Sequence, residues 1–161
     1  MTIFAAMTET YEFNRVRTLG LLEKIEQDPD PQAALAWRPG AGRAHIAWQL
    51  MHIGVTEEIF ATERLAPDKP GSFAELWPRF RGGSTPDDDI PTPAQIRQVL
   101  ADGRAHLLDT LSRFGEQNLT WIPEALKQRG LTLRDVLHIL SHHESHHQGQ
   151  AHITLNLFKA Q

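Results

Sequence analysis

The fold is decided by one stretch near the end of the chain, Leu131–Phe158, which reads LTLRDVLHILSHHESHHQGQAHITLNLF and holds six of the nine histidines. Apolar residues and one threonine recur in it at intervals of three and four, or sums of these, at Leu133, Val136, Leu140, Ala151, Thr154 and Phe158. This spacing is typical of one face of an α-helix that packs against a core. It predicts one long helix with its apolar face turned inward.

Two histidines fill the gap in the middle of this face. At about 100° per residue, His143 and His147 fall on the line of the apolar residues. The other histidines of the stretch point away, namely His138, His142, His146 and His152. Side chains four residues apart on a helix lie about 5–6 Å from each other, so two imidazoles can hold one metal ion. We therefore interpret His143 and His147 as metal ligands, the alternative being hydrogen-bonded core histidines.

Length and composition exclude several classes of protein. A chain of 161 residues with 40% hydrophobic content predicts one domain over residues 1–161 with a substantial core. The absence of cysteine leaves histidine and carboxylate as metal ligands. A net charge of −4 with scattered lysines and arginines argues against a nucleic-acid partner. With no signal-like start and no long apolar run, we expect a cytoplasmic protein without a membrane partner.

Two helices are predicted before the middle of the chain. The first covers about Phe4–Gln27 and ends at the Asp-Pro pairs of residues 28–31, because a residue before proline leaves the helical region. The second covers about Ala44–Arg64, has no clear N-cap and is apolar on most sides, which favours a central position.

A long connection, Leu65–Pro91, follows the second helix and is rich in Pro, Gly and Asp. Within it, a capping box at Ser72–Glu75 predicts one helical turn that ends at Pro78. We expect its three aromatic residues to cover one end of the bundle and its aspartates to form a solvated turn. These residues are Phe73, Trp77 and Phe80, and Asp87, Asp88 and Asp89.

Clear start signals mark the last two helices. Thr92, Pro93 and Gln95 predict the beginning of the third, in which Gly103 indicates a close approach and His106 lies off the apolar line, at the surface. Thr132 with Asp135, after Gly130, predicts the beginning of the fourth.

Four amphipathic helices without strands predict an all-α four-helix bundle with a long connection between its second and third helices. Metal sites in such bundles are built from side chains on facing helices, so a third ligand should come from another helix. His45 and His52 on the second helix are the candidates, and we favour His52 because it lies deeper in the helix.

The chain resembles the DinB family of metal-binding four-helix bundles, also called DinB/YfiT-like. The resemblance rests on HIAWQLMHIGVTEE in the second helix and LHILSHHESHHQGQ in the fourth, including Gly149 and Gln150. It implies that His52, His143 and His147 form a metal triad for a divalent transition metal, zinc or nickel. Gln148 departs from the arginine of many members.

The resemblance also implies an activity. Characterised relatives carry out metal-dependent reactions of low-molecular-weight thiols, as S-transferases and a thiol-dependent isomerase. We therefore expect a metal-dependent S-transferase acting on a small molecule.

Two other functions stay open. Residues 143–147 match H-E-x-x-H, in which Glu144 would be the general base of a metal-dependent hydrolase. The chain has no acidic residue after Glu144, and Gly149 and His152 come one residue too early for the extended form of that motif. The other alternative is a non-catalytic metal-binding stress-response bundle.

We also predict a homodimer. Ile139, Ile153 and Leu157 add apolar surface beside the core-facing line of the last predicted helix.

Overall fold

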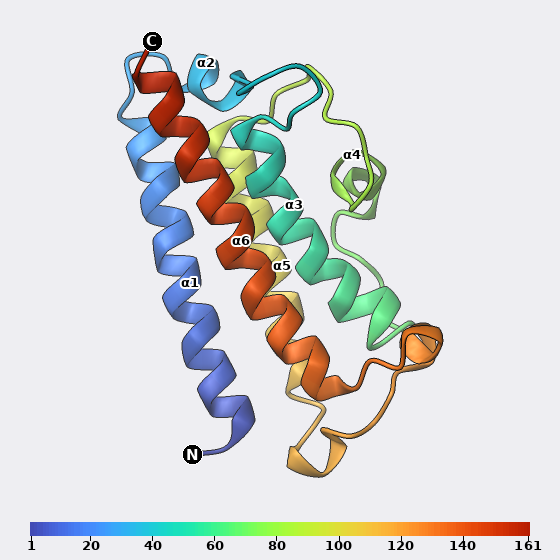
Figure 1. Ribbon diagram of the computed structural model, residues 1–161. Coiled ribbons are helices and arrows are strands. Elements are labelled where there is room, and N and C mark those ends of the chain that lie inside the picture. The colour runs from blue at the N-terminus through green and yellow to red at the C-terminus, as the bar shows by residue number, and fades with distance from the viewer.

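The computed structural model describes residues 1–161 and contains helices but no strands, which confirms the all-α class. Four long helices lie side by side (Figure 1). They are α1 (Ile3–Glu26), α3 (Ile46–Ile59), α5 (Pro93–Leu111) and α6 (Leu133–Lys159). In Figure 1, α1 and α6 run in one direction and α3 and α5 in the other. The connection between α3 and α5 must therefore return along the length of the bundle.

The second long helix departs from its predicted limits. α3 starts at Ile46, and the predicted end at Arg64 is reached only through a π-helical turn, Phe60–Arg64, in which Leu65 N–H donates to Phe60 O (3.1 Å). The N-cap that the sequence did not reveal is His45, whose Nδ1 accepts from Trp48 N–H (3.0 Å). Outside the long connection, the short helices are α2 (Pro31–Ala36) and the 3₁₀ turns Glu116–Asn118 and Glu124–Arg129.

The long connection corrects two predictions. No capping box forms at Ser72; a 3₁₀ turn, Ala74–Leu76, leads into α4 (Trp77–Phe80), and Pro78 lies in the first turn of α4 rather than after its end. Phe73 and Phe80 are buried in the core cluster that includes α3, so the connection covers the side of α3 and not the end of the bundle (Figure 1).

Buried Glu58 of α3 fixes this connection in place. Its carboxylate accepts hydrogen bonds from Ser72 N–H (2.5 Å) and from Trp77 Nε1–H (2.8 Å). His106, predicted at the surface, instead turns inward with Nδ1 3.3 Å from Glu58 Oε1 and a side chain only 11% exposed. That prediction was wrong because the spacing of apolar residues along α5 does not indicate a polar partner on another helix.

α3 and α5 approach closely where glycines meet, as the sequence predicted for Gly103. A Cβ atom on Gly103 would lie 2.5 Å from Gly54 O, and one on Gly54 would lie 2.7 Å from Val99 O. The predicted caps of α5 and α6 are also present, each as a capping box.

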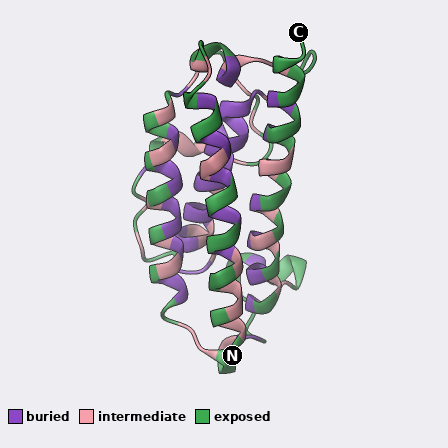
Figure 2. Ribbon diagram, turned by 90° about the vertical axis from the view of Figure 1, so that its left-hand side faces the viewer, coloured by how far each residue is buried: buried purple, intermediate pink, exposed green.

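The hydrophobic core falls into two clusters along the bundle, one around Leu22, Ile53 and Leu100, the other around Tyr11 and Leu137 (Figure 2 shows burial along the helices). On α1, α5 and α6 a buried charged residue lies between the residues of the two clusters, and α3 adds a fourth that is flanked by Val55 and Ile59 of the first cluster. These residues are Arg15, Glu57, Arg104 and Glu144, and we call them the buried tetrad. None of the helices combines the length and the hydrophobicity that a membrane span requires.

Candidate metal centre

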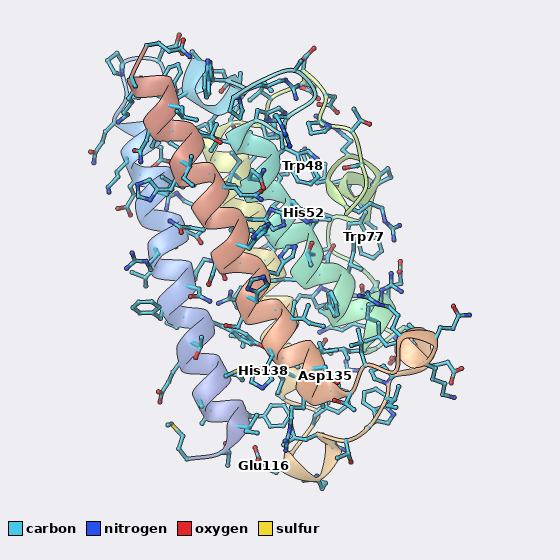
Figure 3. The ribbon with its side chains drawn as sticks, viewed as in Figure 1. Trp48, His52, Trp77, Glu116, Asp135 and His138 are labelled. Atoms are coloured by element: carbon cyan, nitrogen blue, oxygen red, sulfur yellow. The ribbon has the colours of Figure 1, made fainter.

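The structure brings together the three histidines that the sequence singled out, His52 from α3 and His143 and His147 from α6. In Figure 3, His52 lies on α3 where this helix faces α6. One nitrogen of each ring lies within 4.8 Å of the corresponding nitrogens of the other two, and His143 Nε2 is 3.0 Å from His52 Nε2. Two nitrogens bound to one tetrahedral ion at about 2.0–2.1 Å would lie ~3.3 Å apart. The spacing of the three rings is therefore compatible with a metal site.

Two oxygen atoms orient two of these three rings, those of His52 and His147. Phe80 O lies 2.6 Å from His52 Nδ1, and Gln49 Oε1 lies 2.5 Å from His147 Nδ1. A carbonyl oxygen only accepts hydrogen bonds, so each Nδ1 carries the proton and each Nε2 keeps its lone pair. This is the usual arrangement around a metal-binding histidine, whose second nitrogen donates to a carbonyl or carboxylate.

Sequence reasoning missed Gln49 because α3 is apolar on nearly all sides and its orientation was not fixed. The signal available in the sequence was a polar amide in an apolar segment, three residues before His52 and so on the same side of the helix. Trp48 also contacts this centre, with its ring stacked on that of His52 at 4.6 Å between centroids.

Burial keeps the three rings neutral. It lowers the pKa of His143 to about 2, helped by the neighbouring His147 and His52, and lowers the pKa of His147 to about 3, helped by His52. Burial also lowers the pKa of His52, against the opposing effect of its hydrogen bond to Phe80 O. Since neutral imidazole is the form that binds metal, these rings are available as ligands at neutral pH.

The other histidines do not join this group. His138, His142, His146 and His152 are exposed on α6, as predicted from the helical period. His45, the alternative third ligand, is buried as the N-cap of α3, and its Nε2 lies 3.0 Å from Asp87 O.

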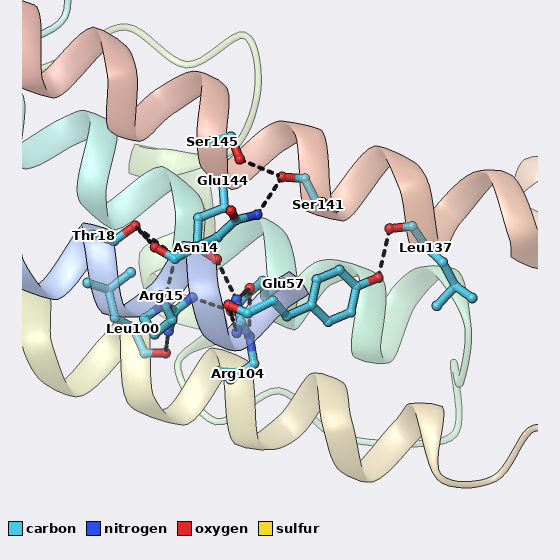
Figure 4. Close-up of polar contacts among 11 residues, drawn as sticks. Asn14, Arg15, Thr18, Glu57, Leu100, Arg104, Leu137, Ser141, Glu144 and Ser145 are labelled. Atoms are coloured by element: carbon cyan, nitrogen blue, oxygen red, sulfur yellow. Dashed lines mark hydrogen bonds and ion pairs between the residues drawn. The ribbon is translucent and has the colours of Figure 1, made fainter. Parts of the chain in front are cut away.

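Glu144 lies next to His143 in sequence but points into the buried tetrad (Figure 4). Its Oε1 accepts from Arg15 Nε (2.8 Å) and Thr18 Oγ1 (2.9 Å), and its Oε2 from Arg104 Nη2. This arrangement disfavours Glu144 as a general base at the metal, because both carboxylate oxygens are held by arginines and a hydroxyl in the core.

The tetrad is closed by Glu57, which accepts from Arg15 Nη2 (2.8 Å) and from Arg104 Nη2 (2.6 Å). Burial alone would lower the pKa of Arg15, but Glu57 and Glu144 outweigh it and hold this pKa above its usual value. With two arginines and two glutamates, the tetrad carries no net charge.

A cavity of about 340 Å³ opens beside the centre and is lined by both His52 and His143. Another cavity, of about 250 Å³ between the long connection and α5, includes none of the three histidines. A small molecule can therefore reach the histidines from the first cavity.

An all-α bundle with three convergent histidines on two facing helices defines a class of candidate metalloproteins. The sequence model of the DinB superfamily matches residues 10–151, a range that includes all three histidines, and the chain belongs to this family. No curated protein and no solved structure gives a significant match.

Proposed function

We propose that the protein is a metal-dependent S-transferase that joins a low-molecular-weight thiol to a small electrophile. The observation that carries the proposal is the convergence of three neutral imidazoles beside an open cavity. Three protein ligands leave a coordination position free, which is typical of catalytic rather than structural sites.

The donor set suits zinc or nickel, because imidazole is a common ligand of both and the chain has no cysteine thiolate to favour a softer ion. When bound, such an ion lowers the pKa of a thiol at the free position, so that the thiol reacts as the thiolate.

The residues of the chain prepare the site for this chemistry. Gln49 Oε1 and Phe80 O fix the tautomers of His147 and His52, and the ring of Trp48 shields one face of His52 from water. The cavity gives the substrate access to His52 and His143.

A hydrolase of the H-E-x-x-H type is less compatible with the structure. The same free position could take a water molecule, but Glu144 is 1% exposed and hydrogen-bonded to Arg15, Arg104 and Thr18. It cannot reach a water molecule at the histidines without breaking the buried tetrad. A non-catalytic metal-binding protein would need no base and is the outcome if no reaction is found.

We further propose a cytoplasmic homodimer. Ile153 and Leu157 are 63% and 48% exposed on α6, whereas Ile139, the third residue of the predicted contact, is half-buried. Light scattering of the untagged protein at about 10–100 µM, a generous range for a standard interface, should give the dimer mass, and a monomer throughout would contradict it.

Metal analysis and thiol kinetics test the function. The untagged protein should contain about one equivalent of zinc or nickel, as three histidines bind one ion, and should accelerate conjugation of a small thiol to a chromogenic electrophile. His143→Ala should lose both properties, and His142→Ala, an exposed neighbour, should keep both. If ester or peptide substrates turn over while a panel of thiols does not, the hydrolase is the better proposal; metal without any turnover indicates a binding protein.

A further inference from the structure

The cavity beside the three histidines is strongly cationic. Besides His52 and His143, it is lined by Arg64, Arg81 and Arg129, and by no acidic residue. Its volume of about 340 Å³ lies within the usual range of small-molecule sites. Metal binding does not explain three arginines at a cavity with neutral histidines, because positive charges repel a bound cation.

The arginines come from three separate segments. Arg64 ends the π-helical turn after α3, Arg81 directly follows α4, and Arg129 ends the 3₁₀ turn Glu124–Arg129. The fold thus collects them from positions far apart in sequence.

Only one carboxylate compensates this charge. Glu63 Oε1 lies 3.2 Å from Arg64 Nη2 and 3.7 Å from Arg81 Nη2, so two guanidinium groups converge on the same oxygen. Arg129 is exposed and has no acidic partner among the residues that line the cavity. An excess of positive charge therefore remains, and planar guanidinium groups bind carboxylate and phosphate oxygens with paired hydrogen bonds.

The path of α3 relates the arginines to the histidines. Thr56, Phe60 and Arg64 follow His52 at intervals of four residues, and all four line the cavity. Twelve residues at 1.5 Å each separate the backbones of His52 and Arg64 by roughly 18 Å. Arg64 and His52 line the same cavity, and helical side chains lean toward the N-terminus, which favours a shorter separation between their side chains than between their backbones. A ligand that joins both groups has its anion several bonds away from the atom at the histidines.

We propose that Arg64, Arg81 and Arg129 form an anion subsite that holds a carboxylate or phosphate of the thiol, whose sulfur lies at the three histidines. The assignment of sulfur to the histidines rests on the proposed transferase function. The anion subsite itself rests on the charge and shape of the cavity.

Calorimetric titration of the protein as purified tests the subsite with three related probes. S-methylglutathione has two carboxylates far from a blocked sulfur, so its binding does not depend on thiol chemistry. The diethyl ester of S-methylglutathione removes the anionic charges. Inorganic phosphate, added as a competitor, separates the two anion classes: displacement shows that phosphate groups are accepted, and its absence restricts the subsite to carboxylates.

Variants should shift S-methylglutathione binding in opposite directions. Arg64→Gln, Arg81→Gln and Arg129→Gln should each weaken it about tenfold, because each removes a charge-assisted hydrogen bond. Glu63→Gln should strengthen it several-fold by releasing Arg64 and Arg81. Arg113→Gln should leave it unchanged, since exposed Arg113 pairs with Asp68 (3.7 Å) and lies outside the cavity.

The subsite would be overturned if the ester and the acid bind equally well, or if Arg113→Gln loses as much affinity as the other arginine variants. It would also be overturned if S-methylglutathione does not bind to the wild type. Arginine-dependent binding without conjugation of any thiol would support the subsite and refute the transferase. Conjugation that is the same for glutathione, its diethyl ester and the arginine variants would support the transferase and refute the subsite.

Discussion

Helices α3 and α6 both contribute to two polar groups, the buried tetrad and the histidine centre. The two differ in how fully their polar atoms are paired. In the buried tetrad, every charge meets an opposite charge, and the most exposed side chain is 8% accessible. At the histidine centre, which begins at the residue next to Glu144, His143 and His52 instead direct nitrogen atoms at each other across 3.0 Å. A polar group whose bonds are complete holds helices together, whereas an incomplete one with access from a cavity is suited to bind a ligand.

The largest effect is expected from breaking the tetrad with Glu144→Gln. Removing one partner of a buried ion pair costs about 3–5 kcal/mol, because the remaining charge is left uncompensated. For a chain of this size, each kcal/mol lowers the melting temperature by roughly 2–4 °C, so a fall of roughly 6–20 °C is expected by calorimetry. Glu12→Gln, an exposed change on α1, is the matched control.

Glu144→Gln also tests whether the buried tetrad and the histidine centre act independently. Below its melting temperature, the variant should bind metal as the wild type does, because Glu144 does not contact the histidines. A melting temperature within about 2 °C of wild type, which corresponds to 1 kcal/mol or less, would show that the tetrad contributes little.

The second effect is the gain in stability from metal. Saturating metal at about a hundredfold over its dissociation constant adds roughly 2.7 kcal/mol if only the folded state binds it. Stripping the metal should therefore lower the melting temperature by roughly 5–10 °C. His52→Ala, His143→Ala and His147→Ala should each abolish most of this difference, and His142→Ala and His146→Ala should preserve it. Loss in His146→Ala together with retention in His147→Ala would contradict the assignment of the ligands.

These two groups were not equally visible in the sequence. The orientation of α6 could be predicted because apolar residues on both sides of the gap, such as Leu140 and Ala151, define one face. Leu137, Glu144 and Leu155 are buried as well, so the buried face of α6 is slightly rotated from the predicted line. His143 and His147 are therefore half-buried at the edge of the core, where a ligand can reach them.

The tetrad could not be predicted, because each member looks like a surface residue in its own helix. Arg15 and Glu144 are 129 positions apart, and only the packing of α1 against α6 makes them partners. The same reason hid the pairing of Glu58 with His106. The π-helical turn that brings Arg64 to the cavity has no signal in the local sequence.

A smaller effect is expected from Gln49→Ala, which removes the group that orients His147. Loss of such an orienting partner typically weakens metal binding about 10–100-fold. Without metal, Gln49→Ala and the wild type should differ in melting temperature by less than the wild type gains when metal is added. The reason is that the hydrogen bond of Gln49 acts on the ring of the ligand His147. A competition titration with a chelator measures the affinity. The control is Gln150→Ala, an exposed change on α6 that removes only a contact to His146. Equal affinities for Gln49→Ala and wild type would show that Gln49 does not orient the ligand.

The smallest effect is expected from His45→Ala, and it separates a structural histidine from the three candidate ligands. His45 Nδ1 caps α3 by accepting from Trp48 N–H, and loss of a side-chain N-cap costs about 1 kcal/mol. The melting temperature should fall by roughly 2–4 °C, and by the same amount with and without metal. His45→Asn, which restores a capping side chain, should recover most of the loss. Should His45→Ala instead remove the stability gained from metal, the third ligand would be His45 and not His52, and the site would have to form near the first turn of α3.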